Sequence, residues 1–70
     1  MNVFYEKSKM PICHPKWFVK GTRVISPHND YHGTVLGFCY SDTLKGEDGV
    51  VKTDRGLCVI TEMTSDFKKE

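Results

Sequence analysis

The sequence predicts a small all-β domain of four or five short antiparallel strands closed into a barrel, preceded by an irregular N-terminal arm. Three observations lead to this prediction. Runs rich in β-branched and aromatic residues recur about every ten residues from Gly21 onward, tight-turn residues separate them, and no segment has the apolar spacing of an amphipathic helix. Closure would also remove the exposed strand edges that so small a sheet leaves.

The chain length sets the number of domains. Seventy residues are enough for one domain only, and we place the arm at residues 1–19 and the barrel at residues 20–67. No apolar run approaches the roughly 18 residues that span a membrane. The first ten residues carry three charges and lack the apolar stretch of a signal peptide. We therefore expect a cytoplasmic protein without membrane contact.

Local residue patterns give the expected elements. In the arm, residues 3–5 favour a short strand, and Pro11 and Pro15 exclude a long helix. In the barrel we expect strands at residues 22–26, 33–40, 50–53 and 57–61, with a polar loop at 41–49. The Asp54-Arg55-Gly56 run predicts a tight hairpin with Gly56 in a left-handed conformation.

The strand at residues 33–40 carries two glycines, Gly33 and Gly37, which indicate a bulge or a sharp bend. Strict alternation would divide this strand into two faces, with Leu36, Phe38 and Tyr40 on one and Val35, Gly37 and Cys39 on the other. Near the C-terminus, Met63 and Phe67 are four residues apart, which favours a helical turn that packs back on the body.

The net charge of +1 conceals an asymmetry. Residues 1–26 carry a balance of +4 and residues 27–70 a balance of −3, so the leading segment is suited to phosphate or to an acidic protein face, or else is a solvated tail. The three cysteines are an odd number, which is typical of reduced thiols in a cytosol. Cys39 and Cys58 lie in apolar runs and are expected to act as small hydrophobes.

Residues with catalytic or metal-binding chemistry do not form a recognisable motif. His28 and His32 are spaced as H-x₃-H but fall on a turn, and Cys13 with His14 lacks the C-x₂-C partner of a zinc knuckle. Cys13 also has no adjacent carboxylate to complete a nucleophile pair. We therefore expect no metal, no cofactor and no enzymatic activity. The acidic residues that cluster later in the chain are interpreted as turn residues: Asp42, Glu47, Asp48 and Asp54.

Two segments carry a resemblance to a known fold. Residues 20–26 (KGTRVIS) and 31–37 (YHGTVLG) resemble the first hairpin of SH3-like barrels, in the pattern of KOW and Tudor-type domains. Residues 54–60 are similar to a later hairpin of these barrels. The resemblance covers about residues 20–61 and implies the SH3-like barrel fold, which hosts many unrelated functions.

A narrower resemblance is to type II dihydrofolate reductases, which are short chains with a loose N-terminal arm and an SH3-like barrel. Residues 21–24, 31–33 and 36–40 are similar to their first two strands. The family's Val-Gln-Ile-Tyr pore motif corresponds to residues 58–61, where only Ile60 matches, and Ser26 replaces the lysine expected after the first strand. The resemblance implies a shared scaffold and, as one alternative, a tetramer.

The function that these patterns predict is a small non-enzymatic binding protein. We expect an accessory or regulatory factor, of a type common in phages and mobile elements, that binds a host protein complex. One alternative is a KOW- or Tudor-like module that binds nucleic acid, because aromatic residues and cations mingle in the arm. A homo-oligomer would help so small a core.

Exposed aromatics and arginine make binding hot spots. The expected partner-binding face consists of Tyr5, Lys16, Trp17, Lys20, Arg23, Tyr31 and His32. The alternative is that these aromatic residues are structural: Trp17 and Phe18 would fill the end of the barrel, and Phe38 would lie in the core.

Overall fold

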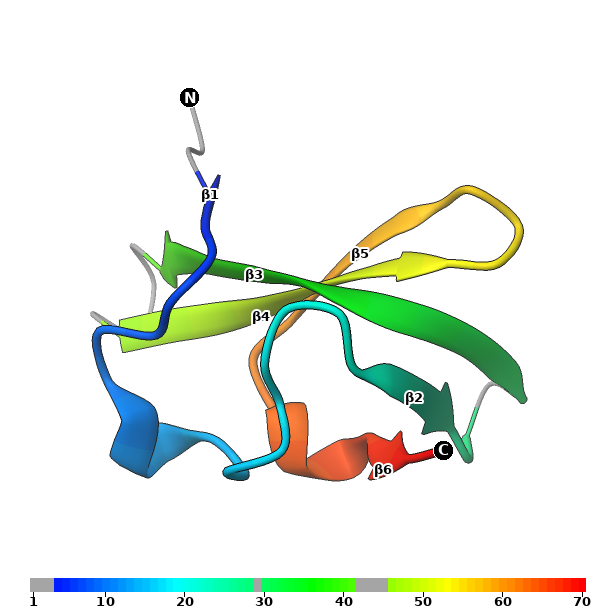
Figure 1. Cartoon of the computed structure of the whole chain (residues 1–70), viewed down its shortest axis with the longest axis horizontal. Helices are drawn as coiled ribbons and strands as arrows, with labels where there is room; N and C mark the ends of the chain where they lie inside the picture. The colour runs from blue at the N-terminus through cyan, green and yellow to red at the C-terminus, as the bar shows by residue number, and fades with distance from the viewer. Residues whose placement is uncertain (1–3, 29, 42–45) are drawn as a thin grey trace.

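The computed structural model describes residues 4–28, 30–41 and 46–70. In these ranges the chain forms an antiparallel sheet and two 3₁₀ turns (Figure 1): β1 (Phe4–Tyr5), η1 (Pro11–Cys13), β2 (Arg23–Ser26), β3 (Tyr31–Ser41), β4 (Gly46–Thr53), β5 (Cys58–Thr61), η2 (Thr64–Asp66) and β6 (Lys68–Lys69). The strands follow the order β5-β4-β3-β2-β6, and β1 also pairs with β3. None of the helical segments described is long and apolar enough to cross a membrane.

The all-β class and the small antiparallel sheet are confirmed, but the sheet is not closed into a barrel. β5 and β6 are the two ends of the strand order, and no ladder joins them in the described ranges. After β5 the chain passes through η2 to the opposite edge, where Lys69 pairs with Val24 and Lys68 with Ile25 (Figure 1). β6 has only two residues, and its ladder pairs it with β2 alone. The count of six strands, where four or five were expected, reflects the two-residue strands β1 and β6.

β3 is longer than expected and contains a bulge. Val35 pairs with Val51 and Gly37 with Val50, so Leu36 is the extra residue. This confirms the bulge that the glycines predicted, but the strict alternation of faces is wrong, because the inserted residue allows Val35 and Phe38 to enter the same core. Gly37 has φ +150°, and a Cβ there would overlap the carbonyl oxygen of Tyr5. The glycine therefore permits the close approach of β1.

The hydrophobic core combines the sheet with two aromatic residues from outside it. Its buried members are Phe18, Val24, Val35, Phe38, Val51 and Phe67. The Phe18 ring lies at the centre of the aromatic contacts, 5.9 Å from the Phe38 ring and 6.1 Å from the Phe67 ring. The core position predicted for Phe38 is confirmed. Trp17 is half-buried and packs against this core, with its ring 5.9 Å from the Phe18 ring.

Two other expectations for buried residues have different outcomes. Cys39 is buried in β3 as expected, but Cys58 is exposed because it lies on the edge strand β5. The helical turn expected near Met63 is the 3₁₀ turn η2, and Phe67 after it packs into the core while Met63 stays exposed. Burial of the Cys39 thiol raises its pKa, since burial disfavours the charged thiolate.

The hairpin of β4 and β5 begins earlier in the sequence than its composition indicates. β4 starts at Gly46 and not at residue 50, so Glu47 and Asp48 are strand residues opposite Tyr40 and Cys39. Their interpretation as turn residues is therefore wrong; Asp42 lies outside the described residues. The turn at Asp54-Arg55-Gly56 is confirmed: Gly56 has φ +87°, and the Thr53 amide donates a 2.7 Å hydrogen bond to the Leu57 carbonyl. The early start of β4 places the Glu47 carboxylate on the buried side of the sheet.

The contrast between Gly37 and Gly56 gives a stability prediction. Gly37→Ala adds a strained left-handed backbone and a clash with the Tyr5 carbonyl, so we expect a loss of about 3 kcal/mol in the free energy of unfolding. Gly56→Ala meets no atom within 4 Å and should cost only about 1 kcal/mol for its backbone. Urea unfolding measures both. Equal losses would show that the contact with β1 contributes nothing at Gly37.

Candidate binding pocket

The side chain of Glu47 is the centre of a buried polar network. It is 1% exposed and accepts hydrogen bonds on both carboxylate oxygens. The Tyr5 hydroxyl (2.7 Å) and the Lys9 backbone amide (2.8 Å) donate to Oε2. The Ser8 hydroxyl (2.5 Å) and the His14 Nε2 (2.9 Å) lie on Oε1. Every one of these donors comes from the segment that precedes the core residue Phe18, so a single carboxylate fastens the N-terminal arm to β4.

His14 joins this carboxylate to η2. Its side chain is 3% exposed, and its ring lies 4.7 Å from the Phe38 ring. Because an ionised carboxylate can only accept, Nε2 carries the proton toward Glu47. Nδ1 lies 2.9 Å from the Thr64 hydroxyl, which donates to it when the imidazole is neutral. Thr64 is itself 1% exposed. The arm, β4 and η2 are thus held together by one chain of hydrogen bonds.

The network shifts the pKa values of two groups. Burial alone would raise the pKa of Glu47, but the hydrogen bonds from Ser8, Lys9, Tyr5 and His14 outweigh burial and lower it. Burial and the bond to Glu47 raise the pKa of Tyr5 to about 12. At neutral pH the carboxylate is therefore charged and the phenol is protonated, which is the combination that the observed hydrogen bond requires.

A hydroxyl, an imidazole and a carboxylate in series have the composition of a hydrolase relay, but their placement differs from that of a reacting group. The Thr64 hydroxyl is buried, so a substrate cannot reach it. Both nitrogens of His14 are already engaged, which leaves none to accept a substrate proton or to activate the exposed Cys13 thiol. The arrangement serves to hold the arm in place.

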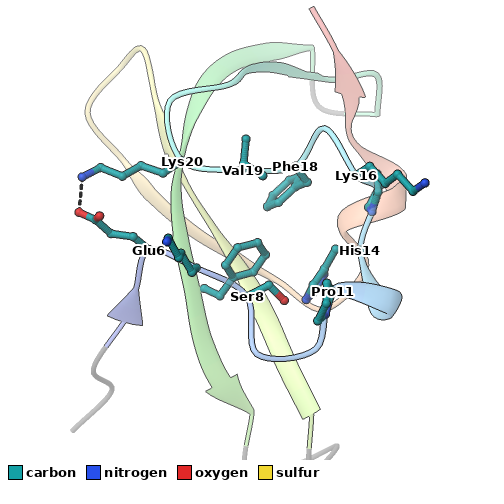
Figure 2. A pocket seen from close by; sticks show the side chains of 11 residues that line it. Glu6, Ser8, Pro11, His14, Lys16, Phe18, Val19 and Lys20 are labelled. Carbon is teal, nitrogen blue, oxygen red and sulfur yellow. Dashed lines mark hydrogen bonds and ion pairs between the residues drawn. The ribbon is translucent and has the colours of Figure 1, made fainter.

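A pocket of about 500 Å³ opens beside this network (Figure 2). Its lining residues come from the arm, between Glu6 and Val19, together with Lys20 and with Phe38 of β3. Its apolar walls are formed by five residues: Pro11, Pro15, Phe18, Val19 and Phe38. Ser8 and His14 contribute polar atoms, and both of these side chains are already bonded to Glu47. A pocket of this volume with mainly apolar walls has the character of a ligand site.

Charged side chains surround the apolar walls. Lys7, Lys16 and Lys20 line the pocket together with one acidic residue, Glu6. Lys20 forms an ion pair with Glu6, which connects the two sides of the pocket (Figure 2). Lys7 and Lys16 form no ion pair with any residue that the structure describes. The rim therefore has an excess of positive charge.

The seven residues of the predicted partner-binding face lie in different surroundings in the structure. Lys16 and Lys20 line the pocket, and the hydroxyl of Tyr5 is bonded to Glu47. Trp17 packs on Phe18. The remaining three are placed by packing or by ion pairs: Tyr31 lies against Phe67 with ring centroids 6.2 Å apart, Arg23 pairs with Asp54, and His32 with Glu70. Only the two lysines share the pocket.

A second group of charged residues connects β2 with the turn between β4 and β5, and β3 with the C-terminal residue. Arg23 donates to both oxygens of Asp54, at 2.6 and 2.7 Å, and His32 Nδ1 lies 2.6 Å from a carboxylate oxygen of Glu70. The hydrogen bond from Arg23 lowers the pKa of Asp54, and the bond from His32 lowers that of Glu70. These groups are exposed, so each pair stabilises the fold only weakly.

The sequence alone did not reveal the central network. In the sequence His14 stands out only beside Cys13, Glu47 has the surroundings of a turn residue, and Thr64 lies in a polar segment without a recognisable motif. A period-two pattern through Glu47, Gly49 and Val51 was the available signal, since all three lie on the buried face of β4. The turn-like composition around Gly46 and Gly49 obscured it.

Metal ligands do not gather in the described parts of the chain. No three His, Cys, Asp or Glu side chains there are close enough to hold a metal ion. Comparisons with protein-family models, with curated proteins and with solved structures find no match to this chain. The pocket and its rim are therefore the basis for a functional proposal.

The Glu47 network predicts a specific dependence on pH. In Glu47→Gln the amide nitrogen would face two hydrogen-bond donors whichever way the amide is turned. We therefore expect the free energy of unfolding to fall by about 3 kcal/mol at neutral pH. The folded-state pKa of Glu47 is lowered, so its contribution is fully present above the ordinary value of 4.5 and disappears as the pH falls through the folded-state pKa. The difference between wild type and variant should therefore shrink in acid.

Chemical denaturation between pH 3 and pH 7 measures this difference. Asp54 and Glu70 also have lowered pKa values, and subtraction of the variant from wild type cancels their contributions. Glu62→Gln, which removes an exposed carboxylate, is the control and should have little effect. A difference for Glu47→Gln that does not change with pH would contradict a buried ionised carboxylate.

Proposed function

We propose that this chain is a small non-enzymatic binding protein on an SH3-like scaffold, and that it holds a protein partner in the pocket that its arm forms with Lys20 and with Phe38 of β3. The scaffold assignment is supported by the sequential pairing of β2, β3, β4 and β5, and by a 3₁₀ turn that precedes a last short strand beside β2. The sequential pairing of β2 to β5 is what the resemblance of residues 20–61 to SH3-like barrels implies.

One observation carries the functional proposal: an open apolar pocket lies beside polar groups whose hydrogen bonds are already made to one another. In the described ranges no buried side-chain nitrogen or oxygen lacks a hydrogen-bond partner. Val19 lines the pocket although it is 51% exposed, and Ile12 on the neighbouring turn η1 is 99% exposed. Exposed apolar side chains beside an apolar pocket favour a contact with another protein over chemistry at the site.

The net charge of only +1 favours a protein partner over nucleic acid, because dedicated nucleic-acid binders are usually far more basic. Arg23 is paired with Asp54, Lys20 with Glu6, and His32 lies on Glu70. Cations that already face carboxylates attract phosphates less strongly than a continuous basic surface does. Nucleic-acid binding by a KOW- or Tudor-like module and a reductase-like tetramer are the alternatives that the experiments below distinguish from a protein partner.

The pocket is tested with a matched pair of variants. Val19 and Ile60 are 51% and 50% exposed, but only Val19 lines the pocket. We expect Val19→Asp to reduce capture of the partner at least about tenfold, because a charge would enter an apolar contact, and Ile60→Asp to leave capture unchanged. This pair is preferable to Trp17→Ala and Tyr31→Ala, which would also remove packing against Phe18 and Phe67.

The measurement is capture from bacterial lysate on the immobilised chain, in nuclease-treated and untreated halves, with circular dichroism of each variant. A partner retained after nuclease and lost only in Val19→Asp supports the proposal. Equal capture by Val19→Asp and wild type would overturn it. Loss of all partners after nuclease would favour nucleic acid, and four chains per particle in light scattering would favour the tetramer.

A further inference from the structure

The walls and the rim of the pocket offer two different kinds of contact. Apolar residues, with Phe18 among them, line the pocket, while Lys16 and Lys20 extend on opposite sides of it (Figure 2). A ligand that fills the pocket would therefore place an apolar group between the walls and meet lysines on both flanks.

The apolar part is suited to an aromatic side chain. About 500 Å³ is ample for one such group, and the exposed side chains of Pro11 and Val19 and the half-buried Pro15 give it apolar walls. The pocket's polar side chains offer little to a polar group, because Ser8 and His14 are held by Glu47. A nucleobase would leave its hydrogen-bonding edge unsatisfied against these walls, which is costly on burial.

The rim is suited to carboxylates. Three lysines and one glutamate line the pocket, which gives the rim an excess of two positive charges. Lys16 and Lys7 have no acidic partner in the described structure, and Lys20 already demonstrates carboxylate binding through its pair with Glu6. Acidic residues on either side of the aromatic group would complement this rim and guide its approach.

We propose that the pocket recognises an acidic peptide segment of the partner that places one aromatic side chain against Pro11, Pro15 and Val19 and carboxylates on Lys16 and Lys7. This inference rests on the proposed function and specifies the chemistry of its partner. A second copy of this chain is a less suitable occupant, because its own arm is basic and would meet a basic rim.

An NMR titration of the labelled chain with short peptides tests the inference. The probe is a capped pentapeptide with one phenylalanine flanked by two glutamates on each side. The comparison peptides replace phenylalanine by alanine, or all the glutamates by lysines. We expect the acidic phenylalanine peptide to bind at least about tenfold more tightly than either, and to shift amides within residues 6–20. Equal binding of the lysine peptide, or no binding of any peptide, would overturn it.

Charge-reversal variants identify the rim. Lys16→Glu should weaken binding of the acidic peptide at least about fivefold and improve binding of the lysine peptide. Lys52→Glu removes an exposed lysine of β4 that does not line the pocket, and should change neither. Both lysines are exposed, so both variants should fold. Equal weakening by the two variants would show a general charge effect and overturn the assigned rim.

The outcomes separate this inference from the proposed function. If Val19→Asp abolishes partner capture but the acidic peptide does not bind, the peptide chemistry is wrong and the binding pocket stands. If the peptide binds but Val19→Asp leaves capture intact, the partner uses another surface. A short single-stranded oligonucleotide that shifts the same amides more strongly than the peptide would overturn the acidic ligand.

Discussion

The burial of one carboxylate is the constraint on which the rest of this structure depends. An ionised Glu47 without partners would be too costly in the core, so the fold must bring donors to it. Those donors are Tyr5, Ser8, the Lys9 amide and His14. All belong to the N-terminal segment, which β1 and the core residue Phe18 also hold against the sheet.

The fixed arm in turn creates the pocket. Its residues from Glu6 to Pro11 form one side, while Pro15 to Lys20 form the other, and the Glu6–Lys20 ion pair connects them. Gly37 contributes by allowing β1 to approach β3 closely. The same interactions that stabilise the small core thus define the binding site, so variants of the network should alter binding through the shape of the pocket.

The two groups of charged residues have different physical roles. The Glu47 network is buried and fully bonded, so it specifies one arrangement of the arm. The Arg23–Asp54 and His32–Glu70 pairs are exposed and contribute little to stability, but they neutralise cations on the strands. Lys7 and Lys16, beside the pocket, are among the cations that form no ion pair with a described residue.

The sequence by itself determined the features that depend on neighbouring residues. The all-β class, the turn at Gly56, the bulge near Gly37 and the core position of Phe38 follow from strand propensity, turn chemistry and glycine freedom, all of which act locally. The sequence did not predict that β4 begins at Gly46, because the glycine and acidic residues at positions 46–49 have the local preferences of a turn although they lie in a strand. Only the tertiary structure decided that Glu47 would be buried, since its partners Tyr5 and His14 are 42 and 33 residues away. It also decided that the sheet remains open and that the arm forms a pocket, because both depend on where distant segments meet.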